Sequence, residues 1–171
     1  MDQIFKIEPL TERHQTAFDQ ILQEYLPGSE PKIVHAKVTQ YPETCLVAVA
    51  KKGVLGIAFG WPRQAAMPEK EYCLDGIAVT YEYWRRGIGS RLLEAFEKAA
   101  AGYGYDKLSV GSAGGFVEKF YLKNGYQPQC FKIYEEGRIT VRKEFSSVEE
   151  FEKCERTEEG FVVFVKCIKQ C

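Results

Sequence analysis

The segment from Tyr72 to Ala101 constrains the chain most, because a buried-type strand, a glycine loop and an amphipathic helix follow one another directly. Its first part is a short apolar run that ends at Val79, which is typical of a strand buried on both faces. Gly87 and Gly89 lie in the loop, and apolar residues then recur at helical spacing as far as Ala100. This succession predicts a sharp turn that opens directly into a helix N-terminus.

Such a loop suits a phosphate. The first N–H groups of a helix have no intrahelical acceptor and carry partial positive charge, so they attract anions. The glycines allow a close approach to the backbone, and Arg85 and Arg86 add positive charge. A helix that merely begins after a glycine turn is the simpler interpretation, but the arginines and the flanking elements favour a pyrophosphate site. The Lys of a Walker loop and the third glycine of a dinucleotide fingerprint are both missing.

The run LDGIAVTYEYWRRGIGSRLL and the later FYLKNGYQP resemble the GNAT superfamily of acyl-CoA-dependent N-acyltransferases. In that family the loop reads Arg or Gln, two residues, Gly, one residue, then Gly or Ala, and its amides bind the pyrophosphate of coenzyme A. Gly87 and Gly89 match the two small positions, while Trp84 stands where Arg or Gln is usual. By element order the resemblance covers residues 1–135.

The resemblance implies an α/β (α+β) fold with a mixed, mostly antiparallel central sheet, a splayed parallel strand pair and flanking helices. We expect the strands near Tyr72 and Lys107 to run parallel and to form this pair, because the helix between them supplies the crossover that parallel strands need. In the family the pantetheine arm lies between the two strands, along the backbone of Ile77, Ala78 and Val79. We expect one acetyltransferase domain over residues 1–171, with residues 136–171 as an extension that completes the sheet.

Tyr121 has two interpretations. Its spacing in Phe116–Tyr121, on a short helix ended by Asn124 and Gly125, is that of a core aromatic residue. The resemblance instead implies the general acid, since a Tyr four residues before a Gly-aromatic pair has that role in the family. A phenol remains protonated at neutral pH and can protonate a departing thiolate. Near Gly114 many members carry an Asn that touches the coenzyme, and this chain lacks it.

The general base is less defined by the sequence. Strand alternation predicts that Cys73, Asp75, Ile77 and Val79 share one face. Family members with a base on this strand carry it at the positions of Cys73 or Asp75, so Asp75, acting directly or through a water chain, is the candidate. A loop-capping or ion-paired Asp is an equal alternative. Further candidates are Glu71, Glu69 and His35, the last more simply a surface or partly packed histidine.

The rest of the chain predicts a strand at Ile4–Ile7, helices after Thr11 and at Ile33–Val38, and a hairpin of Cys45–Ala50 with Val54–Trp61. Beyond Tyr134 the family pattern explains little. Ser146 or Ser147 with Glu149 or Glu150 forms a capping box, and residues 160–168 form a strand that we expect beside the Cys130 strand. The segment between them either covers the acceptor pocket or is a surface excursion.

Composition excludes several classes of protein. At a formal net charge of −1 the chain lacks the basic excess of a general nucleic-acid-binding protein. Six cysteines without a CxxC pair predict buried or free thiols in a reducing cytoplasm, with no metal and no disulfide framework. Neither a signal peptide nor a run long enough to span a membrane is present, so we expect no membrane association.

The sequence and the resemblance together predict an N-acetyltransferase that transfers an acetyl group from acetyl-CoA to a primary amine of a small molecule or peptide. The amine attacks directly in a ternary complex, with the Val79 amide polarising the thioester carbonyl. The alternative is a non-catalytic acyl-CoA-binding or regulatory module of the same fold, and a generic nucleotide-binding domain is a weaker third. The acceptor and a homodimeric state stay open. The expected coenzyme contacts are Ile77, Ala78, Val79, Arg85, Arg86, Gly87, Ile88, Gly89, Ser90 and Tyr121.

Overall fold

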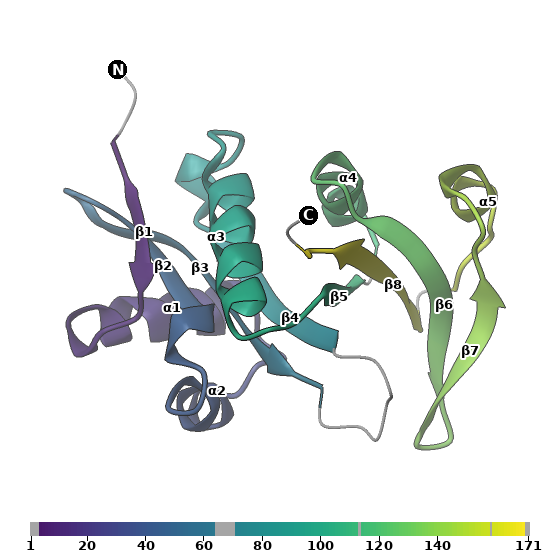
Figure 1. Cartoon of the computed structure of the whole chain (residues 1–171), viewed down its shortest axis with the longest axis horizontal. Coiled ribbons are helices and arrows are strands. Elements are labelled where there is room, and N and C mark those ends of the chain that lie inside the picture. Colours follow the sequence, from purple (N-terminus) through teal and green to yellow (C-terminus); the bar gives the residue numbers. More distant parts are fainter. Residues whose placement is uncertain (1–3, 64–70, 113, 158, 170–171) are drawn as a thin grey trace. The chain divides into compact units, whose positions relative to one another are not determined.

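A computed structural model describes residues 4–63, 71–112, 114–157 and 159–169 of the chain (Figure 1). The chain divides into two compact units, residues 1–106 with 168–171 and residues 107–167. Each unit is described by itself. Among the described residues, no helix is both long and apolar enough to cross a membrane.

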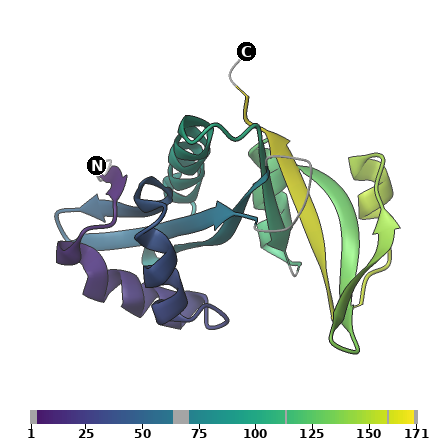
Figure 2. The ribbon, with the colours of Figure 1, turned by 60° about the horizontal axis from the view of Figure 1, so that its bottom comes forward.

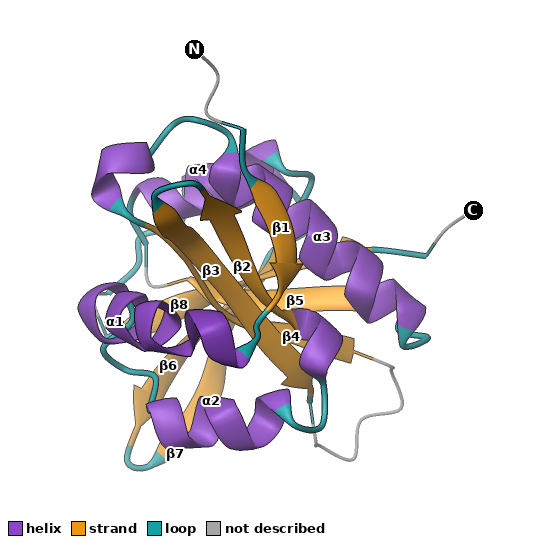
Figure 3. Ribbon diagram, turned by 90° about the vertical axis from the view of Figure 1, so that its left-hand side faces the viewer, coloured by secondary structure: helices purple, strands orange, loops and turns teal. Residues whose placement is uncertain are grey.

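The first unit is built on four antiparallel strands in chain order. They are β1 (Lys6–Pro9), β2 (Cys45–Ala50), β3 (Gly53–Pro62) and β4 (Glu71–Val79). The predicted hairpin is confirmed, since Ala50 pairs with Gly53 across a two-residue turn. Two helices cover one face and a third covers the other (Figure 3). The helical elements are η1 (Glu12–His14), α1 (Gln15–Tyr25), α2 (Pro31–Val38), η2 (Pro42–Thr44), η3 (Tyr81–Tyr83) and α3 (Ile88–Gly102).

The two faces of this sheet have different cores. On the α1 and α2 face, Phe18 packs edge-on against Phe59 with ring centroids 5.9 Å apart. On the α3 face, the buried Tyr72 packs against Phe96 at 5.7 Å and its hydroxyl lies 2.5 Å from Thr44 Oγ1. Burial raises the pKa of the Tyr72 phenol well above its ordinary value. Both helix layers are therefore fixed to the sheet by large aromatic side chains.

A register shift interrupts β4. Phe59 pairs with Gly76 and Gly60 with Leu74, which leaves Asp75 as an extra residue in the ladder, a β-bulge. The bulge re-aims the side chains that follow it. Side chains therefore do not alternate regularly between the two faces of the sheet along the whole of β4.

The predicted common face for Cys73, Asp75, Ile77 and Val79 is therefore wrong. Cys73 pairs with Trp61, which packs in the core under α1 and α2. Val79 pairs with Gly56, where a Cβ would meet the Val79 side chain and Leu92 of α3. The strand changes faces at Asp75.

The second unit is also an antiparallel sheet, in the order β5 (Lys107–Ser112), β8 (Gly160–Cys167), β6 (Gln127–Glu135) and β7 (Arg138–Glu144). The expected pairing of the last strand with the Cys130 strand is confirmed. The sequence did not indicate that β8 also pairs with β5 along its length, so that the last strand lies between two earlier ones (Figure 2). A two-residue turn with positive φ at Glu136 and Gly137 joins β6 to β7.

Helices α4 (Phe116–Lys123) and α5 (Val148–Glu152) complete the second unit. The predicted N-cap is confirmed, because Glu150 N–H donates to Ser147 Oγ at 3.1 Å, while the Glu150 carboxylate accepts at 2.9 Å from the N–H of Ser146, one residue before the cap. Phe151 is buried against Phe164 of β8, so α5 is anchored in the core of the unit, whereas β7 is exposed along its whole length. The two expectations for this segment, a cover over the acceptor pocket and a surface excursion, both stay predictions.

The predicted fold class is confirmed, with mostly antiparallel strands flanked by helices in the expected element order. The strands expected to run in parallel are β4, in the first unit, and β5, in the second. None of the five described cysteines takes part in a disulfide. Burial raises the pKa of the Cys45 thiol to about 12. Cys171 lies outside the described residues.

We predict that Gly60→Ala destabilises the protein by about 2 kcal/mol or more, because an overpacked site forces neighbouring atoms to shift. A Cβ there would lie 2.0 Å from the Cys73 carbonyl oxygen and 2.7 Å from the Phe96 ring. The matched control is Gly102→Ala in α3, where a Cβ meets nothing within 4 Å. Denaturant unfolding followed by tryptophan fluorescence measures both, and equal stability of the two variants would contradict the close approach at Gly60.

Candidate active site

The N-terminus of α3 is open to an anion. Gly87, the N-cap residue, has φ of +78° and provides no side-chain cap. Within the helix the first backbone bond runs from Arg91 N–H to Gly87 O at 3.0 Å. Among the described residues, the N–H groups of Ile88, Gly89 and Ser90 thus have no hydrogen-bond acceptor. Three such donors at the positive end of a helix are the arrangement that anion sites at helix N-termini use, and binding at this one stays a prediction.

Positive side chains flank these amides. Arg85 and Arg86 are exposed, and the Arg86 guanidinium lies 5.3 Å from the centre of the Tyr83 ring. Arg85 has φ of +59°, a left-handed conformation that costs energy in a residue with a Cβ. Ile88 is buried and fixes the helix start. The loop is therefore accessible, as a phosphate site requires.

Trp84 ties the loop to the end of β4. Its indole N–H donates to the Val79 carbonyl oxygen at 2.6 Å, and its ring packs edge-on against Tyr81 at 4.9 Å. The sequence singled out Trp84 only as a departure from the family pattern. The side chain holds the chain between strand and helix in a fixed turn.

The backbone of β4 beyond the bulge has a defined orientation. Thr80 N–H donates to Leu55 O at 2.9 Å, so every second residue back along β4, including Ala78, bonds toward β3. The N–H and C=O groups of Ile77 and Val79 consequently point to the opposite edge of the strand. Of these groups, the Val79 carbonyl accepts the Trp84 bond.

The candidate bases occupy different environments in the first unit. Asp75 is exposed at the bulge, while the surrounding protein desolvates its carboxyl and raises its pKa. Glu71 is buried, with Oε1 3.6 Å from Arg63 Nη1 and, among the described residues, no hydrogen bond to that oxygen. His35 lies on α2 and contacts Asp19 at 2.7 Å. Glu69 lies outside the described residues.

Tyr121 belongs to the second unit, on α4. Its side chain is 3% exposed and its ring packs against Tyr126 and Phe164, with centroids 5.7 Å and 5.8 Å away. The core interpretation of this residue is thus confirmed. Its role as general acid stays a prediction, as do the roles of Asp75 and the loop residues.

A sequence model of the Acetyltransferase (GNAT) family matches residues 8–126. The chain belongs to this family. A comparison with curated proteins finds no significant sequence match.

Solved structures of GNAT proteins are similar to this chain in fold. Ard1 from Thermoplasma volcanium has 15% identity and a TM-score of 0.72, covering 97% of this chain and 99% of its own. The ribosomal-protein-S18-alanine N-acetyltransferase from Escherichia coli has 16% identity and a TM-score of 0.65, and the match covers 98% of this chain and 96% of that enzyme. An aminoglycoside 6′-N-acetyltransferase complexed with coenzyme A has 15% identity and a TM-score of 0.67, and the match covers 97% of this chain and 98% of that enzyme.

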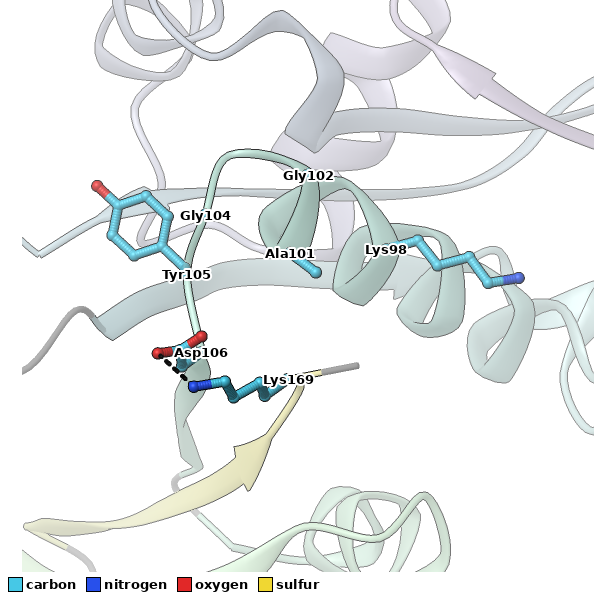
Figure 4. Close-up of a pocket in the computed structure, with 7 residues that line it drawn as sticks. All are labelled: Lys98, Ala101, Gly102, Gly104, Tyr105, Asp106 and Lys169. Atoms are coloured by element: carbon cyan, nitrogen blue, oxygen red, sulfur yellow. Dashed lines mark ion pairs between the residues drawn. The ribbon is translucent and has the colours of Figure 1, made fainter. Parts of the chain in front are cut away.

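A cavity of about 310 Å³ lies at the other end of α3 (Figure 4). Its charged lining includes Lys98, and Asp106 and Lys169 form an ion pair across 4.0 Å. The cavity is lined from Lys98 onward and the glycine loop precedes Ile88, so the two lie toward opposite ends of a helix about 22 Å long. It is separate from the predicted phosphate site.

We predict that Asp75→Asn makes the folded protein slightly more stable at neutral pH. The folded-state pKa of Asp75 is raised, so the charged carboxylate is less favourable in the folded than in the unfolded state. The gain should disappear below pH 3.8, the ordinary pKa of the group, where both states of the wild type are protonated. Thermal unfolding of the variant and the wild type from pH 3 to pH 8 measures this difference. A difference in stability that does not grow in favour of the variant as pH rises would contradict the desolvation of Asp75.

Proposed function

We propose that this GNAT protein is an acetyl-CoA-dependent N-acetyltransferase that acts on a primary amine of a small molecule or peptide. The observation that supports it most is the uncapped, exposed N-terminus of α3 beside Arg85 and Arg86. A diphosphate carries negative charge that suits three amides, a helix dipole and two guanidinium groups. The backbone N–H groups from Arg86 to Ser90 would hold the coenzyme pyrophosphate.

The edge of β4 suits the rest of the coenzyme. The backbone groups of Ile77 and the Val79 N–H point away from β3 and are oriented to pair with the amides of a pantetheine arm. The Val79 carbonyl already accepts the Trp84 bond, and the group of Val79 that the proposal uses is its N–H. In this proposal that N–H stabilises the developing oxyanion of the thioester carbonyl.

The reaction proceeds by direct attack of the neutral amine on the thioester carbonyl carbon. A C–N bond forms, the C–S bond breaks, and the amine loses a proton while the coenzyme thiolate gains one. Asp75 accepts the amine proton through water, and its raised pKa brings the carboxylate closer to the working pH of a general base. Tyr121 gives its phenol proton to the thiolate.

The acceptor is proposed at the level of its chemical class. Among proteins of similar fold, one is an S18-alanine N-acetyltransferase and another an aminoglycoside 6′-N-acetyltransferase. Both names describe transfer to nitrogen, one on a protein and one on a small molecule. They support an amine acceptor. The candidate acceptors to test are antibiotics, polyamines, amino acids and peptide N-termini.

We predict that the protein releases free coenzyme A from acetyl-CoA in the presence of a suitable primary amine, and that Tyr121→Phe lowers kcat about a hundredfold, the range of general acid catalysis. A thiol-detection assay over a panel of amines measures both. The matched control is Tyr134→Phe, which removes an exposed phenol from the same unit. Coenzyme binding without thiol release for any amine would favour the non-catalytic module, and full turnover in Tyr121→Phe would remove this residue from the mechanism.

A further inference from the structure

The helix that carries Tyr121 is weakly fixed by its own sequence. Helix α4 has only eight residues and no side-chain N-cap bond. It follows Gly114 and Gly115, which have φ of +109° and +75°. Helices this short are unstable alone and take their position from tertiary contacts.

The first turn of α4 is held by an ion pair. Glu118 is 7% exposed, and its Oε1 accepts a hydrogen bond from Arg156 Nη1 at 2.6 Å. The Arg156 guanidinium also lies 4.4 Å from the centre of the Phe151 ring. A carboxylate this buried is strongly destabilised when its partner is removed, so the pair fixes the start of the helix.

The last turn of α4 is held by a second cation. Lys166 Nζ of β8 donates to the carbonyl oxygen of Asn124, the C-cap residue, at 2.9 Å. A positive charge at this end also complements the helix dipole. The ammonium group lies 5.5 Å from the centre of the Tyr126 ring.

An aromatic contact supports the middle of the helix. The Tyr121 ring packs against Phe164, which packs against Phe151 with centroids 5.5 Å apart. All the supporting side chains, from Phe151 to Lys166, follow residue 126, where the family match ends. The shared family pattern therefore does not account for these supports.

We infer that Arg156 and Lys166 are positioning residues, which clamp α4 at its two ends and so hold the Tyr121 phenol in place for proton transfer. This inference rests on the proposed role of Tyr121. A general acid must lie within hydrogen-bond reach of the leaving sulfur, and a small displacement of its helix lowers the rate. The C-terminal extension thus becomes part of the catalytic framework.

The clamp itself is tested by hydrogen exchange of the α4 amides. Arg156→Met keeps an apolar stem over Phe151 and removes the guanidinium. Exchange in α4 should become about tenfold faster, the factor that corresponds to loss of one charge-assisted hydrogen bond. Lys153→Met is the control, since it breaks the exposed 2.6 Å pair with Glu149 of α5 and removes neither of the two clamp contacts with α4. Unchanged protection of α4 in Arg156→Met would overturn the clamp.

The positioning role is tested by kinetics on the same variants. Arg156→Met should lower kcat about tenfold and leave the KM for acetyl-CoA unchanged, because the phosphate loop belongs to the other unit. In a Tyr121→Phe background the same change should cost nothing more, since the group that it positions is absent. Equal losses in both backgrounds would overturn the positioning role. Lys166→Met, which acts at the other end of α4, replaces Arg156→Met if that variant does not fold.

These outcomes separate the inference from the proposed function. If Tyr121→Phe turns over normally, the acid role fails, and exchange of the α4 amides alone decides whether the clamp exists. If Tyr121→Phe is slow and Arg156→Met is fully active, the acid role stands and the positioning inference fails.

Discussion

The unpartnered amides at the start of α3 are the feature on which the functional account depends. They stay free because Gly87 offers no side chain as a cap and because Trp84 ties the preceding turn to the Val79 carbonyl. The buried side chains of α3, among them Ile88 and Phe96, hold the helix against the sheet, and the N-cap residue Gly87 at its positive end is exposed. An anion site here costs no rearrangement, since the donors are already oriented.

The β-bulge at Asp75 is the second constraint. It moves the side chains of β4 from one face to the other between Cys73 and Val79, while the backbone groups of Ile77 and Val79 point to the edge opposite β3. Bulges of this kind re-aim groups beside functional sites. The bulge also leaves Asp75 exposed at the point where the strand changes faces, with a carboxyl whose pKa is raised.

Most local features of this chain could be predicted from its sequence, while of the non-local ones only the pairing of β8 with β6 was expected. Helical spacing and glycines located α3 and its loop, and the serine and glutamate spacing located the cap of α5. The bulge was not predicted, because the expected alternation of side chains assumes that every residue of the strand, Asp75 included, is paired in a regular ladder. The Glu118–Arg156 pair joins residues 38 apart, and the insertion of β8 between β5 and β6 depends on long-range pairing. Neither has a local sequence signal.

Isothermal titration with coenzyme A tests the central claim most directly, when the wild type is compared with Gly89→Glu and Gly102→Glu. Both changes add one negative charge to α3, at its first turn and at its last residue. The account predicts binding by the wild type and by Gly102→Glu, and affinity at least about tenfold weaker in Gly89→Glu, which corresponds to about 1.4 kcal/mol. No binding by the wild type at millimolar coenzyme, or equal affinity in the two variants, would contradict it.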